Sequence, residues 1–494
     1  MRKVCTKNKL KVEIMDINSK ENIPSPKIVA KAGLWYTICT FTFKAMAFLT
    51  TPFFTRYMSK SELGGFTDFS SLASILIVIT SMDLYQSIIR SKSEFYDDMD
   101  SYIWSLLSLS TIWTLFVYLI FIIFPNFFQT ILKINYEYIH VLFFYLLFSP
   151  SYTMLITKQR AFYKYKHFVL LTGIMAFSGT TLSFILVLLM NNKLAGRIIG
   201  FYSPFIFFGS LIFVYIAIKG KKIKLTYWKY ASKICIPLVP HDLSLHILGV
   251  SDVILITRLC GQEYTAYYSV AYSAYHIATV FFDAMNKAWA PWLLDSLESK
   301  NYDSIKKVSK IYISTFCFII IGIILLVPEI ILILGGKQYN ESIYCLPPLL
   351  ASSAFLFIFT MYVNIEFFEK KTHGVSIATA IGCIINILLN IIFLPLLKEK
   401  SYIVASYTTL VGYVFLFIVH FFIVRSMKMD FVYDTHFIFK TLLFILIISA
   451  SMNIIYKILI IRLIIIIIYI LIFVLIIVKY HRPLREILLE KKLN

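Results

Sequence analysis

The sequence predicts an all-α polytopic membrane protein with about 14 transmembrane helices, and three observations support this fold class. Hydrophobic residues make up 59% of the 494 residues and charged residues only 15%, whereas a soluble domain is nearer half apolar and a quarter charged. Apolar stretches of about 20 residues, the length that a helix needs to cross ~30 Å of hydrocarbon, recur from Lys31 almost to the C-terminus. The loops between them are too short to hold a soluble domain. This composition excludes a soluble multidomain enzyme.

The elements follow in chain order. The first 30 residues are polar and basic and lack the apolar segment of a signal peptide, so we expect a cytoplasmic tail over 1–30. The spans expected after it are 31–54, 66–89, 101–124, 136–157, 167–190, 195–218, 234–257, 264–290, 311–334, 343–367, 374–397, 401–424, 436–456 and 459–478. A second basic tail, 479–494, closes the chain.

The distribution of Lys and Arg predicts the orientation of these spans. The N-terminal tail and the even-numbered gaps between spans hold roughly three times as many basic residues as the odd-numbered gaps. Since basic residues stay on the cytoplasmic side, both termini are expected in the cytoplasm. Orientation explains the net charge of +20, so we expect no nucleic-acid partner. Lys44 and Lys287 remain inside apolar stretches, where a charge needs a partner or water.

A short internal repeat links the two halves of the chain. The end of the first span reads TRYMSKSELGGF from Thr55 to Phe66, and the end of the seventh reads TRLCGQEYTAY from Thr257 to Tyr267. The offset is about 201 residues and six spans separate the two sites, so both halves would have the same orientation. This predicts parallel repeats related by an axis along the membrane normal, which is a common transporter architecture.

Span 264–290 carries one polar and aromatic helix face. Its members recur at steps of three or four residues: Tyr268, Tyr272, Tyr275, Thr279, Asp283 and Lys287. In one interpretation Asp283 and Lys287 neutralise each other and the tyrosines pack between helices. In the other, the face lines a water-filled cavity in which tyrosine rings stack on sugars. The sequence leaves both interpretations open.

Span 234–257 contains a second set of polar residues. Pro237 and Pro240 open it, and four residues follow at helical spacing: Asp242, His246, Gly249 and Asp252. Backbone carbonyls freed by proline are tolerated in the membrane only inside protein or beside water, which favours a cavity. Alternatively, Asp252 lies solvated near the outer interface.

Lys44 of the first span lies too deep to reach a headgroup layer easily, and Asp83 of the second span is its expected partner. The histidines in the spans, His246 and His276, lack metal-ligand spacing, and the seven cysteines show no CxxC pair. No nucleotide-binding glycine pattern occurs. We therefore expect no metal site and no bound cofactor.

Three blocks of sequence resemble the polysaccharide-biosynthesis flippases, the Wzx or O-antigen translocase group. The most specific block begins PLVPHDLSLHILGVSDVILITRLC and ends YSVAYSAYHIATVFFDAMNKAWAPWL, with Asn286, Ala288, Trp289 and Pro291 matching its Asn-x-AWxP ending. PFFTRYMSKSELGGF with SMDLYQSIIR looks like the opening of the family, and Phe368 to Asn390 resembles a third block. The family usually has a Gly near Ser59 and a Lys-Tyr-Gly turn where this chain reads LLKEKSYIVAS, so we expect that outer loop to differ in shape.

The resemblance implies a fold and an activity. The fold would comprise two six-helix bundles, 31–218 and 234–425, joined by a basic cytoplasmic linker, 219–233, and followed by two additional helices in 426–478. The activity would be that of the multidrug/oligosaccharidyl-lipid/polysaccharide exporter superfamily. Such a flippase moves undecaprenyl-diphosphate-linked oligosaccharide, for O-antigen or a related polysaccharide, between the leaflets of the bacterial inner membrane. It works by alternating access, often with H⁺ or Na⁺ coupling.

The residues suit that substrate, because diphosphate charge and sugar hydroxyls are costly in hydrocarbon unless they are paired. We assign the diphosphate or an acidic sugar to Lys44 and Lys287, and the glycan to Tyr268, Tyr272 and Tyr275. Arg90 is a further expected substrate-binding residue. We assign ion pairing or coupling to four further residues: Asp83, Asp252, Asp283 and His246. The implied partners are the lipid-linked oligosaccharide, membrane lipids, a polysaccharide polymerase and a chain-length regulator.

Two other functions were weighed against this one. A multidrug or metabolite antiporter of the same superfamily would share the bundles and differ in the chemistry of the cavity. A membrane glycosyltransferase, polymerase or acyltransferase needs a sizeable extramembrane loop or a tight set of acid and base residues, and the sequence contains neither. We therefore expect a transporter and not an enzyme.

Overall fold

The computed structural model describes residues 26–369 and 372–475, and this part of the chain is helical without strands. The first half contains α2 (Pro26–Tyr57), α3 (Lys60–Ser81), α5 (Met99–Ile123), α7 (Tyr136–Ala161), α8 (Tyr165–Leu189) and α9 (Lys193–Gly220). The second half contains α11 (Val239–Leu259), α12 (Gln262–Glu298), α13 (Tyr302–Leu325), α15 (Leu346–Phe368), α16 (Thr372–Leu396), α17 (Ser401–Ser426), α18 (Thr435–Ile455) and a last helix, Leu459–Leu475. Shorter helices are η1 (Leu84–Gln86), α4 (Ser87–Ser91), α6 (Pro125–Leu132), α10 (Leu225–Cys235) and α14 (Val327–Gly335).

Each predicted span coincides with one of the long helices or with the last helix, and the polytopic all-α fold class is confirmed. Among the described residues, 11 helices are long and apolar enough to cross a membrane. The helices α2 and α12 are not among them, and the last helix is shorter than the others in its described part. Most of the predicted tail 1–30 and all of the tail 479–494 lie outside the described residues.

Two predicted spans end earlier in the structure than expected. The span predicted over 66–89 ends with α3 at Ser81, because Met82 and Asp83 adopt left-handed backbone conformations with φ of 50° and 46°. The span predicted over 311–334 is divided, because Pro328 lies in the first turn of α14 and cannot continue α13. At the start of α3, Ser59 and Glu62 form a reciprocal capping box that fixes the first turn.

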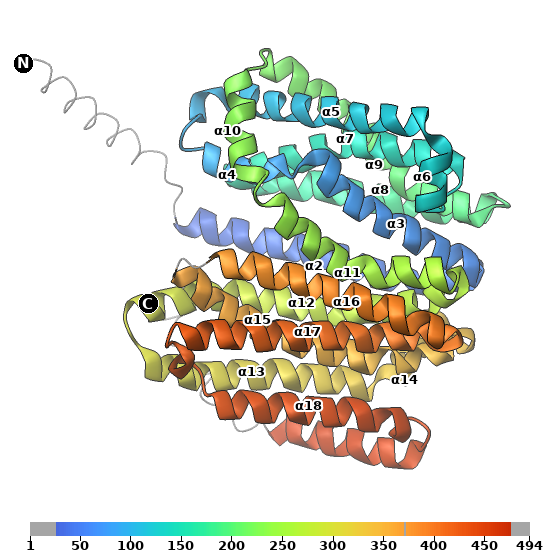
Figure 1. The fold of residues 1–494 in the computed structure, drawn as a ribbon, viewed down its shortest axis with the longest axis vertical. Coiled ribbons are helices and arrows are strands. Elements are labelled where there is room, and N and C mark those ends of the chain that lie inside the picture. Colours follow the sequence, from blue (N-terminus) through green and yellow to red (C-terminus); the bar gives the residue numbers. More distant parts are fainter. Residues whose placement is uncertain (1–25, 370–371, 476–494) are drawn as a thin grey trace, which may run out of the picture.

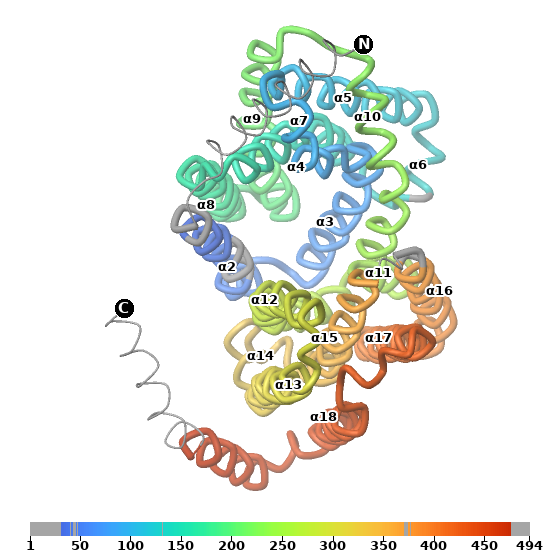
Figure 2. The backbone as a smooth tube through the Cα atoms, turned by 90° about the vertical axis from the view of Figure 1, so that its left-hand side faces the viewer, coloured from blue at the N-terminus to red at the C-terminus, as the bar shows by residue number. Residues whose placement is uncertain are grey.

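The long helices run side by side in two groups (Figure 1). Seen along the helices, α5, α7, α8 and α9 lie in one group and α13, α15, α17 and α18 in the other, and α2, α3, α11 and α12 lie where the groups meet (Figure 2). The contacts between the groups follow a pseudo-symmetric pattern, because α2 packs on α12 as α11 packs on α3. The helix α15 forms the centre of the second half, and most of its residues are buried.

Candidate functional site

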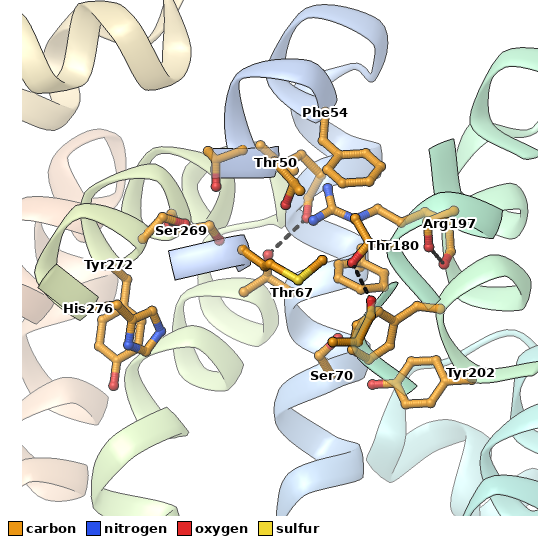
Figure 3. Close-up of a pocket in the computed structure, with 18 of the residues that line it drawn as sticks. Thr50, Phe54, Thr67, Ser70, Thr180, Arg197, Tyr202, Ser269, Tyr272 and His276 are labelled. Atoms are coloured by element: carbon orange, nitrogen blue, oxygen red, sulfur yellow. Dashed lines mark hydrogen bonds between the residues drawn. The ribbon is translucent and has the colours of Figure 1, made fainter. Parts of the chain in front are cut away.

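A cavity of about 450 Å³ lies between the two helix groups. Its walls come from α2, α3, α8 and α9 of the first half and from α12 of the second (Figure 3). The lining is largely aromatic and aliphatic, with hydroxyl groups from Thr50, Thr51, Thr67, Ser70, Thr180, Ser183, Ser269 and Ser273. An apolar cavity with a few polar groups that fix the orientation of a ligand is typical of a binding site.

Among the described residues, Arg197 is the Lys or Arg side chain that lines this cavity. Its guanidinium carbon lies 3.7 Å from the ring centroid of Phe54 and 4.1 Å from that of Phe66, so the group is held between two aromatic rings. Nη1 approaches the sulfur of Met58 at 3.6 Å. No carboxylate of the described residues forms an ion pair with it. The guanidinium is therefore positioned by aromatic contacts, and its charge can act on an anion in the cavity.

Arg197 was not singled out from the sequence, because it lies at the start of the predicted span 195–218, where a basic residue is common at a membrane interface. Asn192 caps α9 by accepting a hydrogen bond from the backbone N–H of Ala195 at 3.0 Å, and the helix carries Arg197 into the wall of the cavity. The signal in the sequence was a cation inside a predicted span, the criterion that singled out Lys44 and Lys287.

The predicted aromatic face of α12 divides between two environments. Tyr272 lines the cavity together with His276, and their rings meet edge to face at 4.9 Å. Tyr268 and Tyr275 are only 1% and 4% exposed and belong to the core of the second half. The structure thus places one of the three tyrosines at the cavity and packs the other two between helices.

Asp252 does not line the cavity, and it is buried in protein and not solvated as the second interpretation required. It is buried between α11, α12, α16 and α17, with 3% of its surface exposed. Its carboxylate accepts hydrogen bonds from Tyr268 Oη at 2.5 Å, Asn390 Nδ2 at 2.6 Å, Asn386 Nδ2 at 3.4 Å and Thr409 Oγ1. Among the described residues no Lys or Arg pairs with this carboxylate. Neutral dipoles alone therefore stabilise its charge.

The Asp252 cluster is rich in oxygen atoms. Asn386 Oδ1 accepts from Ser251 Oγ at 2.8 Å, and Asn390 Oδ1 accepts from Thr408 Oγ1 at 2.6 Å. A carboxylate, two amide carbonyls and several hydroxyls are the ligand types that hard cations prefer. No group of three or more His, Cys, Asp or Glu side chains that could hold a metal ion occurs in the described part of the chain.

The end of the cavity opposite the start of α2, here called the outer end in contrast to the tail side where α2 begins, is closed by contacts between the two repeat segments. Ser61 Oγ donates to Gln262 Oε1 at 2.9 Å, and Lys60 Nζ donates to Tyr267 Oη at 2.5 Å. Ser61 and Gln262 are 201 residues apart, the offset of the repeat, so equivalent positions of the two repeats touch each other.

Two further contacts tighten this closure. Arg258 Nη1 donates to Asp68 Oδ2 at 2.8 Å, an ion pair between α11 and α3 that is largely buried. Gly64 of α3 approaches α12 so closely that a Cβ at this position would lie 1.9 Å from the carbonyl oxygen of Gln262. Only glycine permits this contact, because any other residue would displace the backbone of α12.

The remaining predicted site residues whose side chains are described lie outside the cavity. Arg90 is exposed at the end of α4, His246 is exposed on α11, and Asp283 is half-buried on α12. Lys287 is exposed on α12, 25 residues beyond the start of that helix, and does not line the cavity. Its depth in the membrane stays a prediction. The side chain of Lys44 lies outside the described residues.

Asp83 lies in the turn after α3, where the predicted pairing with Lys44 is not described. Its carboxyl group is 5% exposed and lies near a second carboxyl group, that of Asp242, which accepts from Gln86 Nε2 at 2.6 Å. Burial, with a smaller contribution from the Asp242 charge, raises the pKa of Asp83 to about 6. The carboxyl group of Asp83 therefore exchanges its proton near pH 6.

Comparisons with known proteins agree with this architecture. The profile of a family described as polysaccharide biosynthesis protein matches residues 29–297. A solved structure of the lipid II flippase MurJ in an inward closed conformation superposes with a TM-score of 0.64 at 17% identity, covering 91% of this chain and 100% of that chain.

A multidrug resistance MATE family transporter of the MOP superfamily, in an inward-facing conformation, superposes with a TM-score of 0.52 at 13% identity and covers 79% of this chain and 99% of that chain. A comparison with curated protein sequences gives no match. The chain therefore has the fold shared by these transporters.

Proposed function

Since the chain belongs to the polysaccharide biosynthesis protein family, we propose that it is a flippase for undecaprenyl-diphosphate-linked oligosaccharide. The fold it shares with flippases and exporters supports transport in preference to catalysis. The substrate would pass from the cytoplasmic to the periplasmic leaflet of the bacterial inner membrane, for use in O-antigen or a related polysaccharide. The distribution of Lys and Arg supports cytoplasmic termini.

The observation that carries this proposal is Arg197. A diphosphate needs a cation when it leaves water, and guanidinium donors match phosphate oxygens in pairs. The threonine and serine hydroxyls around the cavity can replace the water that sugar hydroxyls lose. A cationic drug, by contrast, would be repelled by Arg197, so the cavity favours an anionic substrate over the cationic substrate of a multidrug antiporter.

Alternating access would use the two predicted bundles, 31–218 and 234–425, as moving parts. The contacts at Ser61, Gly64 and Arg258 hold the outer ends together, so the cavity is loaded from the side of the N-terminal tail. Release to the periplasm requires these contacts to separate while the tail-side ends close. A polymerase and a chain-length regulator would receive the product on the outer side.

Coupling to an ion gradient is part of the proposal, and we place it at Asp252. A buried carboxylate without a basic partner gains most from binding H⁺ or Na⁺, because either ion removes its net charge. Tyr268 connects this carboxylate to α12, the helix that also lines the cavity and forms the outer closure. Ion binding at Asp252 is thereby able to change the position of α12.

The direct test measures the leaflet distribution of undecaprenyl-diphosphate-linked glycan in cells that lack the chain. We expect cytoplasmic accumulation that wild type relieves, that Arg197→Ala does not relieve, and that Arg197→Lys relieves in part. Arg56→Ala is the matched control, because Arg56 is exposed and outside the cavity. If Arg197→Ala inserts normally and exports as wild type does, the anion-binding assignment is wrong. If units reach the outer leaflet without the chain, the protein is not the flippase.

A further inference from the structure

The segment between the two halves folds into a helix that lies across the others. Figure 1 shows α10 at the same end of the molecule as the start of α2, running roughly perpendicular to the long helices, and Figure 2, seen along those helices, shows α10 lengthwise. Because the long helices cross the membrane, α10 lies approximately parallel to the membrane plane at the tail-side surface.

One face of α10 is anchored to the first half. Tyr227, Ala231 and Cys235 are buried against α5, η1 and α4. Trp228 Nε1 donates to the carbonyl of Ser105 at 2.7 Å, and Tyr227 Oη donates to Asp98 Oδ2 at 2.5 Å. These contacts fix the rotation of the helix and therefore decide which residues point away from the protein.

The opposite face combines apolar and cationic side chains. Leu225, Lys229, Lys233 and Ile236 recur at steps of four, four and three, so they share one helix face. All four are exposed, with 70% of Leu225 and 52% of Ile236 accessible, and Ile223 just before the helix is 48% exposed. Exposed Leu225 and Ile236 thus lie on the face that carries the lysines, which is typical of a helix at a membrane interface and not of one that borders only water.

The lysines of this segment have few counter-charges on the protein. Lys224 pairs with Asp98. The other five form no ion pair with any described residue: Lys219, Lys221, Lys222, Lys229 and Lys233. All five are exposed, so their charge faces whatever borders this surface.

We propose that this face, defined by Leu225, Lys229, Lys233 and Ile236 with the lysines of 219–222, is a docking surface for anionic phospholipid headgroups. Apolar side chains would enter the boundary between headgroups and acyl chains while the lysines pair with headgroup phosphates. The cytoplasmic leaflet is where anionic lipids concentrate and where the basic residues of this chain predict that the tail side lies. The surface would therefore hold the first half at the membrane interface, next to the segment that links the two halves. This inference stands on α10 alone and does not depend on the identity of the transported substrate.

The test uses the full chain purified from membranes that contain phosphatidylglycerol and phosphatidylethanolamine, with native mass spectrometry to count the lipids that stay bound. We expect wild type to retain phosphatidylglycerol preferentially and Lys229→Gln/Lys233→Gln to lose that preference severalfold. The conservative pair Lys229→Arg/Lys233→Arg should keep it. The matched control is Lys398→Gln/Lys400→Gln, which removes two exposed lysines from the opposite end of the molecule.

Equal retention of phosphatidylglycerol by wild type and the Lys229→Gln/Lys233→Gln variant overturns the proposal. An equal loss in the control variant also overturns it, because the effect would then follow from net charge. Thermal unfolding in detergent is measured in parallel, and since both lysines are exposed the midpoint should not move. A second variant, Leu225→Ser, tests the apolar part and should weaken retention while the charge is unchanged.

Discussion

At the scale of single residues, removing the charge of Asp252 should abolish coupling of transport to the ion gradient while the protein still folds. Asp252→Asn keeps the shape of the side chain and most of its hydrogen-bond partners but removes the charge. We expect transport by this variant to lose its dependence on the ion gradient, with a modest change in stability of about 1–2 kcal/mol. Transport in vesicles with imposed H⁺ or Na⁺ gradients measures this.

Asp242→Asn is the control for this prediction, because Asp242 is also a carboxylate of α11 but hydrogen-bonds to Gln86 near the tail side. A gradient dependence that persists in Asp252→Asn and disappears in Asp242→Asn would move the coupling site to the tail side. A shift of the thermal midpoint by Na⁺ in wild type, absent in Asp252→Asn, would identify Na⁺ as the ion.

Asp83 gives a prediction for pH. Its pKa is raised to about 6 in the folded protein, against about 3.9 in the unfolded chain, so the folded state binds the extra proton. Its contribution to stability is therefore complete below pH ~4 and is lost as the pH rises towards ~6, by up to about 3 kcal/mol. Thermal unfolding across this range should show a steeper decline in wild type than in Asp83→Asn. Parallel curves for the two proteins would contradict the assignment.

At the scale of elements, the sequence was enough to place every long helix, because an apolar stretch of about 20 residues has few alternatives in a membrane. The sequence did not predict where a helix ends inside such an apolar stretch. The left-handed backbone at Met82 and Asp83 cannot be recognised from hydropathy, and because of it Asp83 lies in a turn and not in the predicted span.

The candidate site was less predictable than the helices for a related reason. Helical spacing showed that Tyr268, Tyr272 and Tyr275 share a face, but it could not show that the second half covers two of them. Arg197 was overlooked because a basic residue at the start of a predicted span is ordinary at a membrane interface, and its spacing did not show that it faces a cavity. In both cases the missing information was the packing partner.

The contact between α3 and α12 gives a prediction at the element scale. Gly64→Ala introduces a methyl group that would lie 1.9 Å from the backbone oxygen of Gln262. We expect this clash to destabilise the conformation with a closed outer end by about 1–3 kcal/mol, which lowers its population relative to the open conformation by roughly 5- to 150-fold. Distance measurements by spin labels on α3 and α12 should show the outer ends more separated than in wild type.

Gly249→Ala is the matched control, since a Cβ at Gly249 meets nothing within 4 Å. Its distance distribution should match that of wild type. If Gly64→Ala leaves the distribution unchanged as well, α12 adjusts to the methyl group and the glycine does not control the closure.

At the scale of the whole molecule, the Ser61–Gln262 contact links the two halves at one point. Oxidation of a Ser61→Cys/Gln262→Cys variant should form a disulfide that holds the outer ends together and abolishes transport, and a reductant should restore it. The six cysteines in the described part are buried, so background cross-linking should be small. Full transport by the oxidised variant would show that the outer ends need not separate.

A residue that touches its own counterpart in the other repeat must lie on the axis that relates them, and Ser61 with Gln262 meets this condition. A half-length ancestral chain that paired with a copy of itself in this way would have placed two identical side chains in contact there. Duplication and fusion would then free the two positions to differ, so that one now supplies a hydroxyl and the other an amide. Away from the axis each half can acquire its own chemistry, as the cavity wall with Arg197 in one and the Asp252 cluster in the other illustrate. At positions on the axis, a substitution in one repeat must remain compatible with the side chain at the equivalent position of the other repeat.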